Sequence, residues 1–377
     1  MSAPRLPLLE RLVLREIAGP LAVGLLAILQ LLVILQLLQL NEVVFGSAVS
    51  PGDLVRVTAA LAPHFLVTAV PLALMLGVQL GMGRLAADHE LLALTAAGTH
   101  PLRLYRVPAA VGAALALAVA ALAHWAEPWG FRQLNAVLND VIKRNLKTGL
   151  EPGVFNDGLP RFMVYVTSEE PGADASYATW RGVLIEDDVG DGAPLLALAE
   201  VGRVLDAGGE ALALHLSRGE LHRMEADGET VARFSEGTFL VGVQDPVTRK
   251  NRFSRNEAAL TGPELRQRVR ELRRSAPKEA ARLGLEQVRR WAMPFACFAF
   301  ALLSVPLALI ARGSRGGAYL FTVGAFVAFY ALSRLSMALA EGGLDPWLAG
   351  FLPDACILAL AAAQTRQLLR NGIRKPS

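Results

Sequence analysis

Charged residues are scarce in this sequence. Asp, Glu, Lys and Arg make up only 19% of its 377 residues, whereas hydrophobic residues make up 53%. A soluble globular domain carries about 25% charged residues. A composition this apolar therefore argues against a protein that is soluble throughout.

Cysteine is nearly absent, with Cys297 and Cys356 as the two examples, both inside apolar stretches. They offer neither a disulfide framework nor the spacing of a metal site. The six histidines show no H-E-x-x-H pattern, the chain has no G-x-x-x-x-G-K-[ST] sequence, and no G-x-S-x-G turn surrounds Ser304. No catalytic site, metal or cofactor is predicted, which disfavours an enzyme such as an intramembrane hydrolase.

Long apolar runs are what the sequence does have. Each is near the ~20 residues that an α-helix needs to cross the hydrocarbon core, although the last is the shortest. The first is too long for the apolar core of a cleavable signal peptide, which is about 7–15 residues. Because the charges lie between the runs, we predict six transmembrane helices rather than buried helices of a large soluble protein. The runs are 17–40, 61–83, 104–125, 291–311, 318–340 and 347–364.

Basic residues concentrate in alternate connecting segments, while the remaining short loops contain only Arg56. By the positive-inside rule, both termini are predicted to be cytoplasmic and residues 126–290 to lie outside the cytoplasm. The basic stretch 266–290 is compatible with this side, because long domains translocate largely regardless of charge. The basic segments carry Arg5, Arg11, Arg15, Arg84, Arg103, Arg106, Arg312, Arg315, Arg366, Arg370, Arg374 and Lys375.

The inserted region alternates apolar and polar residues, as half-buried strands do, and Gly/Asp-rich turns separate the alternating stretches. The pattern indicates antiparallel strands in a sandwich or jelly roll. We therefore expect a polytopic α-helical membrane protein with an inserted all-β, jelly-roll-like domain. Its expected parts are a membrane half at 1–125, the β domain at 126–262, a basic connecting helix at 263–290, and a second membrane half at 291–377.

The cytoplasmic loop 83–101, GRLAADHELLALTAAGTHP, is unusually apolar. Its Leu, Ala and Glu residues predict a helix over 84–97. Asp88 and Glu90 disfavour an anionic membrane surface as its partner and favour a basic protein. We expect Glu90 to be the polar anchor of that contact, with Leu91 and Leu94 as apolar knobs. The residues assigned to this helix are Arg84, Leu85, Asp88, Glu90, Leu91 and Leu94.

The segment RLAADHELLALTAAG resembles the pattern R-L-x-x-D-x-E-L-x-x-L-x-A-x-G of the lipopolysaccharide export permeases, the LptF/LptG (YjgP/YjgQ) family. VRRWAMPFACFAFALLSVPLAL at 288–309 is similar to the fourth span of that family, and AEVGRVLDAGGEALALHLSRGELHR at 199–223 to its soluble domain. The order of three spans, an insertion and three spans agrees over nearly the whole chain. The short first loop, ending in Phe45 and Gly46, looks more like the LptF half than the LptG half.

The resemblance implies a transport subunit in the bacterial inner membrane, with its β domain in the periplasm. It implies pairing with a second LptF/LptG-type permease and docking of a separate, dimeric cytoplasmic ATPase (LptB-like) on the helix at 84–97. Lipopolysaccharide would be extracted from the inner membrane and passed through the β-jellyroll to periplasmic bridge proteins (LptC/LptA-like). Nucleic acid is not an expected partner.

The expected lipid path combines polar residues of the first span with inward residues of the β domain. Family members often carry Lys or Arg in the first span, but this chain has Gln30, Gln36, Gln39 and Asn41 there. Phosphate binding by this half would then fall to Arg56 or to the basic helix. The residues assigned to the path are Gln36, Gln39, Val164, Val166, Leu214, Leu216, Phe239 and Val241.

Arg334 and Asp354 are predicted to form an ion pair inside the membrane. Both lie ~10 Å deep at a rise of 1.5 Å per residue, and an unpaired charge at that depth costs several kcal/mol.

Two other functions remain open from the sequence. The first is a membrane scaffold or mechanotransmitter that couples a cytoplasmic ATPase to a periplasmic partner without a lipid path. The second is a secondary transporter, which predicts inverted repeats and ionisable sites at the bilayer midplane. The sequence shows neither inverted repeats nor ionisable sites at the midplane.

Overall fold

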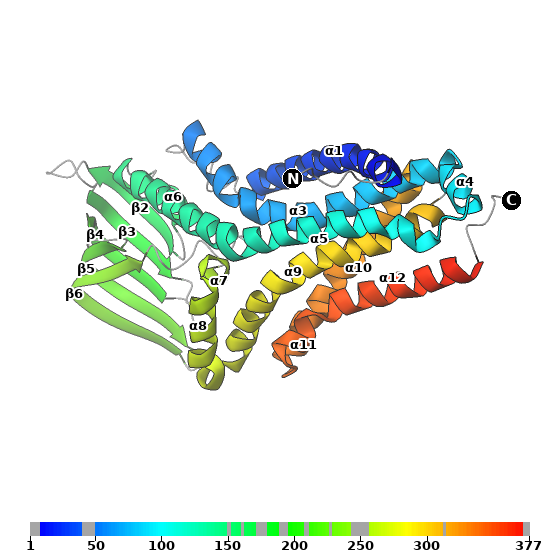
Figure 1. Cartoon of the computed structure of the whole chain (residues 1–377). Helices are drawn as coiled ribbons and strands as arrows, with labels where there is room; N and C mark the ends of the chain where they lie inside the picture. Colours follow the sequence, from blue (N-terminus) through cyan, green and yellow to red (C-terminus); the bar gives the residue numbers. More distant parts are fainter. Residues whose placement is uncertain are drawn as a thin grey trace, which may run out of the picture. The chain divides into compact units, whose positions relative to one another are not determined.

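The computed structural model contains long helices and one β sheet (Figure 1). It describes residues 8–39, 50–148, 152–159, 162–170, 179–187, 195–206, 211–225, 228–242, 256–311 and 314–371. Several residues used above lie outside these ranges, namely Arg5, Asn41, Phe45, Gly46, Arg312, Arg374 and Lys375.

The described residues belong to two compact units. The helical unit is drawn from Met1–Ile34, Ala62–Pro128 and Leu260–Ser377, and the β unit from Leu35–Leu61 and Trp129–Ala259.

Five described helical segments are long and apolar enough to cross a membrane. They agree in position with the first five predicted runs. The third comprises η1 (Pro101–Tyr105), α5 (Arg106–Ala121), a π-helical turn η2 (Leu122–Ala126) and the start of α6 (Glu127–Thr148). The others lie in α1 (Leu8–Gln39), α3 (Pro51–Ala87), α9 (Pro277–Ile310) and α10 (Arg315–Glu341).

The sixth apolar run forms two helices. The short α11 (Pro346–Gly350) begins at Asp345, whose carboxylate accepts a hydrogen bond from the Trp347 backbone N–H. After Phe351, α12 (Leu352–Asn371) continues to the end of the described chain. This segment is not among the five apolar helices long enough to span, so a count of six spans stays a prediction.

Two glycines bring α1 close to α3. A Cβ atom at Gly77 would lie 2.7 Å from the Leu21 Cβ, and one at Gly81 would lie 2.7 Å from the Glu16 carbonyl oxygen. Their four-residue spacing places them on one face of α3. This is the small-xxx-small pattern that lets helix backbones approach in a membrane.

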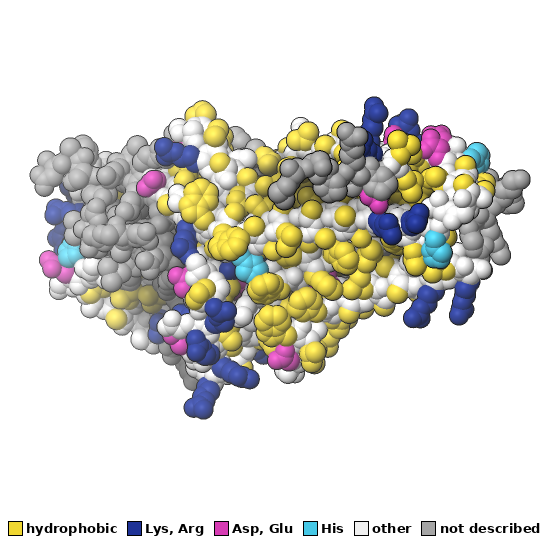
Figure 2. Space-filling view, in the orientation of Figure 1, with side chains coloured by type: hydrophobic (Ala, Val, Ile, Leu, Met, Phe, Trp, Pro, Cys, Tyr) yellow, Lys and Arg dark blue, Asp and Glu magenta, His cyan; other side chains and the backbone are white. Residues whose placement is uncertain are grey.

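The helical unit has a shared apolar core. α1, α3, α5 and α9 contribute Val13, Ile17, Leu74, Val119 and Val305 to it, all buried. α3 and α9 are largely buried, whereas most of α1 and α10 is exposed at the surface of this chain. Figure 2 shows hydrophobic side chains covering the middle of the long helices and charged ones gathered toward their ends.

The β unit contains a six-stranded antiparallel sheet in the order β1-β2-β3-β4-β5-β6. The fold prediction of a helical membrane protein with an inserted β domain is thereby confirmed. Each strand pairs with its neighbours in sequence. The strands are β1 (Phe155–Leu159), β2 (Phe162–Glu170), β3 (Thr179–Asp187), β4 (Leu195–Asp206), β5 (Ala211–Glu225) and β6 (Gly228–Gly242).

In one row of residues across the sheet, the alternation of side chains between the two faces is interrupted. Each ladder from β2 to β6 skips one pair there, and the same register resumes beyond it. Gly182 and Arg218 have positive φ angles of 60° and 54° in this row, as local breaks in extended backbone allow. Buried side chains change spacing from two to three across it, as at Trp180 and Val183 on β3.

The segment after the sheet divides into helices. α7 (Asn256–Ala259) is followed by α8 (Gly262–Ser275), which begins where the Thr261 backbone N–H donates to the Glu264 carboxylate at 2.6 Å. Ala276 separates α8 from α9. The basic residues 263–290 therefore lie on two helices.

Candidate functional site

The apolar cytoplasmic loop forms a break followed by a short helix. α3 ends at Ala87, and His89 adopts a left-handed conformation (φ 58°) before α4 (Glu90–Ala96) begins. The predicted continuous helix over 84–97 is therefore wrong. A left-handed residue ends an α-helix, so the chain changes direction between Arg84 and Glu90.

This change of direction separates the predicted docking residues. Leu91 is fully buried and, with Leu85 and Leu104, belongs to the apolar core of the helical unit. Leu94 is partly buried against the same core. The prediction that Leu91 is an exposed knob is therefore wrong, because its side chain fixes α4 to its own chain. Glu90 and Asp88 remain exposed.

Ion pairs connect the helices that surround α4. The Arg84 guanidinium lies 3.2 Å from the Glu16 carboxylate and 3.8 Å from that of Asp88. The Arg106 guanidinium lies 3.8 Å from the Glu10 carboxylate. Pairs this exposed contribute only about 0–1 kcal/mol each. Glu90 has no ion pair among the described residues, which leaves its carboxylate available to a partner.

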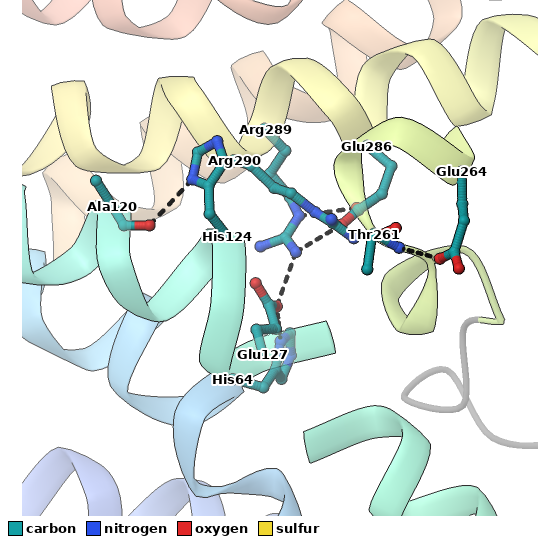
Figure 3. Close-up of polar contacts among 9 residues, drawn as sticks. All are labelled: His64, Ala120, His124, Glu127, Thr261, Glu264, Glu286, Arg289 and Arg290. Atoms are coloured by element: carbon teal, nitrogen blue, oxygen red, sulfur yellow. Dashed lines mark hydrogen bonds and ion pairs between the residues drawn. The ribbon is translucent and has the colours of Figure 1, made fainter. Parts of the chain in front are cut away.

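A second polar cluster joins three helices of the helical unit, as Figure 3 shows. One Arg289 nitrogen donates to Glu127 at 2.7 Å and also to Glu286 at 2.7 Å. The Arg289 Nε donates to the other Glu286 oxygen at 2.8 Å. His64 Nδ1 lies 2.6 Å from the same Glu127 oxygen. We call these four residues the interhelix cluster.

The interhelix cluster depends on local helix geometry. Glu127 follows directly on the π-helical turn Leu122–Ala126, and such turns change which way the next side chains point. His64 comes from α3, Glu127 from the start of α6, and Arg289 and Glu286 from α9. The Glu127 side chain is fully buried and that of Arg289 is 24% exposed. A buried carboxylate requires such charged partners.

Sequence reasoning did not predict the interhelix cluster. Glu127 lies 63 residues from His64 and 162 from Arg289, so no local spacing relates them. The available signals were an acidic residue at the end of an apolar run and the Arg289-Arg290 pair at the start of another.

The predicted ion pair between Arg334 and Asp354 is not formed. Two Arg334 nitrogens donate to the Tyr330 hydroxyl at 2.7 and 3.1 Å, one helical turn earlier on α10. Asp354 is fully buried on α12, and neither carboxylate oxygen has a hydrogen-bond partner among the described residues. Equal depth in a membrane fixes only the position along a helix, and packing decides which way each side chain points.

The structure describes the side chains of some of the residues assigned to a lipid path. Val164, Val166, Leu214 and Leu216 are buried in the β unit, and Gln36 is buried with its carbonyl oxygen unpaired among the described residues. Phe239 and Val241 pair through their backbones with Leu214 and Leu212. The side chains of Gln39, Phe239 and Val241 lie outside the described part of the chain.

Apolar helices long enough to span, together with an inserted antiparallel sheet, define a polytopic membrane protein with a β domain. The profile of the family described as lipopolysaccharide export system permease LptF/LptG matches residues 11–367. The chain belongs to this family and is thus a lipopolysaccharide export permease, an inner-membrane transport subunit. No curated protein sequence matches the chain.

Proposed function

We propose that this chain is the LptF-type permease subunit of an ABC transporter. In this proposal it pairs with a second LptF/LptG-type permease and docks a dimeric, LptB-like cytoplasmic ATPase. It extracts lipopolysaccharide from the inner membrane and passes it to LptC/LptA-like bridge proteins. The family match over residues 11–367 carries the proposal.

The proposed topology places both termini and α4 in the cytoplasm and the β unit in the periplasm. The basic residues of alternate connecting segments support this orientation. Under this topology α4 is the part of the described chain that meets the ATPase. The exposed Glu90, which has no ion pair within the described part of the chain, would pair with a basic residue at the rim of the ATPase groove.

Glu90→Lys is expected to abolish co-purification of the ATPase with this chain at equal expression. A charged hydrogen bond contributes about 1.5–3 kcal/mol, equivalent to roughly 10- to 150-fold in Kd, and the new lysine adds repulsion. Glu90→Ala should weaken binding within that range. Asp88→Ala is the matched control, because Asp88 is already placed near Arg84. Undiminished binding of the Glu90→Lys protein would remove Glu90 from the interface, and loss with Asp88→Ala alone would move the anchor to Asp88.

The buried residues of the sheet support a lipid path through the β unit. Val164 and Val166 of β2 pair with Ile185 and Val183 of β3, forming adjacent buried rows. These side chains are covered by the protein itself in this structure, so the proposed path requires their cover to open. An apolar surface opened in this way can hold acyl chains away from water. Leu214 and Leu216 continue the buried surface on β5.

A photo-crosslinking residue at Val166 or Leu216 is expected to capture lipopolysaccharide when the assembled transporter hydrolyses ATP. Met163 and Leu198 are control positions with exposed side chains. Met163 lies on β2, the strand of Val166, and Leu198 lies on β4, which pairs with the strand of Leu216. Capture confined to the control positions, or equal capture without ATP, would contradict the path. Intact assembly with no capture anywhere would instead favour a mechanical transmitter.

A further inference from the structure

α8 is an amphipathic helix whose apolar face is already occupied. Leu265 is fully buried, and Val269 and Leu272 are partly buried within the helical unit. Its opposite face is exposed and basic, and Figure 2 shows Lys and Arg side chains gathered over α8 and the start of α9. The exposed cations of this face are Arg266, Arg268, Arg270, Arg273, Arg274 and Lys278. We call them the α8 basic face.

The α8 basic face is only partly neutralised by its own chain. Its six cations accompany three carboxylates over residues 262–279. Glu264 accepts from the Thr261 backbone, and Glu271 lies 3.5 Å from Arg268. Arg266, Arg273 and Arg274 form no ion pair among the described residues. The face therefore presents free guanidinium groups, whose forked donors match phosphate oxygens.

The position of α8 along the helical unit is at the outer edge of a lipid headgroup layer. Arg282 of α9 pairs at 2.7 Å with Glu341, the last residue of the apolar helix α10. This pair marks the level at which α10 ends. Ala276 lies six residues earlier on the chain, ~9 Å along a helix. The headgroup region is roughly 5–7 Å thick on each side of the bilayer, so α8 lies just beyond it, and long Arg side chains can extend back to the headgroups.

Two further observations fit this level. Trp347 is half exposed on α11, and tryptophan is enriched at membrane–water interfaces. Figure 1 shows α8 lying across the ends of the long helices rather than continuing their direction. From these observations we expect its exposed face to lie beside the surface of the surrounding bilayer.

We propose that the α8 basic face binds the phosphate groups of anionic bilayer phospholipids. Because its apolar face packs within its own chain, α8 binds the bilayer surface through its charges and does not insert into the lipid. The proposed ligand is the surrounding bilayer and not the transported lipid, so this contact is additional to the transport function. It anchors the segment through which the chain returns from the β unit to the membrane. An electrostatic contact of this kind weakens with salt, since exposed charges are screened within about 8–10 Å at 0.1–0.15 M.

The test uses the full chain in nanodiscs of phosphatidylcholine containing a fluorescent phosphatidylglycerol. A photo-crosslinking residue at the exposed Ser275 reports lipid capture. Capture is expected to fall about 10-fold or more in the triple variant Arg266→Gln/Arg270→Gln/Arg273→Gln, because each cation near an anionic surface contributes roughly fivefold. It should also fall in 0.5 M salt. Arg103→Gln/Arg366→Gln/Arg370→Gln removes three exposed cations elsewhere in the helical unit and should leave capture unchanged.

Four outcomes would overturn the proposal. The first is equal capture by the triple variant and the parent chain. The second is equal capture of a fluorescent phosphatidylcholine. The third is complete loss of capture in 10 mM inorganic phosphate, which would indicate a discrete site for free phosphate. The fourth is displacement by lipopolysaccharide but not by unlabelled phosphatidylglycerol, which would assign the α8 basic face to the transported lipid.

Discussion

Arg289→Ala is expected to lower the free energy of unfolding by about 3–5 kcal/mol, the usual effect of removing one member of a buried ion pair. Glu127 would lose the guanidinium that lies 2.7 Å away, and its carboxylate is fully buried. Glu286 would lose two hydrogen bonds from the same side chain. The remaining hydrogen bond of the Glu127 carboxylate would be the one with His64 Nδ1, at 2.6 Å.

The measurement is thermal unfolding of the purified chain in detergent, compared across single and double variants. Arg282→Ala is the matched control on α9, because its pair with Glu341 is exposed and contributes only about 0–1 kcal/mol. The double variant Arg289→Ala/Glu127→Gln should recover part of the loss by removing the unpaired charge. Equal midpoints for the Arg289→Ala and Arg282→Ala proteins would contradict a stabilising role for the interhelix cluster.

Gly81→Ala is expected to destabilise the packing of α1 on α3 by about 1–3 kcal/mol, the range for overpacking a close contact. The added Cβ would meet backbone atoms of Glu16 and Ile17, which cannot rotate away as a side chain can. The intrinsic helix preference acts in the opposite direction, because alanine favours a helix over glycine by about 1 kcal/mol. A net loss would therefore be caused by the contact alone.

Gly19→Ala provides the control for this prediction. Gly19 also lies within a helix, α1, but a Cβ there meets nothing within 4 Å. Its thermal midpoint in detergent should stay level or rise slightly, whereas that of the Gly81→Ala protein should fall. A rise in both variants would show that α1 and α3 do not depend on this close approach.

Much of the architecture was predictable because its signals are local. Five of the apolar runs coincide with helices long enough to span, since the length of an apolar run must match the bilayer thickness. Alternation of apolar residues predicted the β insertion, and the pattern around Asp88 and Glu90 indicated the family that the profile match shows. The alternation did not predict the interrupted row at Gly182 and Arg218. That interruption requires several neighbouring strands to break their extended backbone in the same row.

The sequence by itself thus determined the apolar helices, the inserted β structure and the family, because each depends on residue types at short, regular spacing. The tertiary structure decided where individual side chains point. It buries Leu91 in the core, turns Arg334 to Tyr330 rather than Asp354, and brings Arg289 to Glu127. These outcomes depend on the rotation of each helix about its own axis, and that rotation is set by the packing of all its neighbours together.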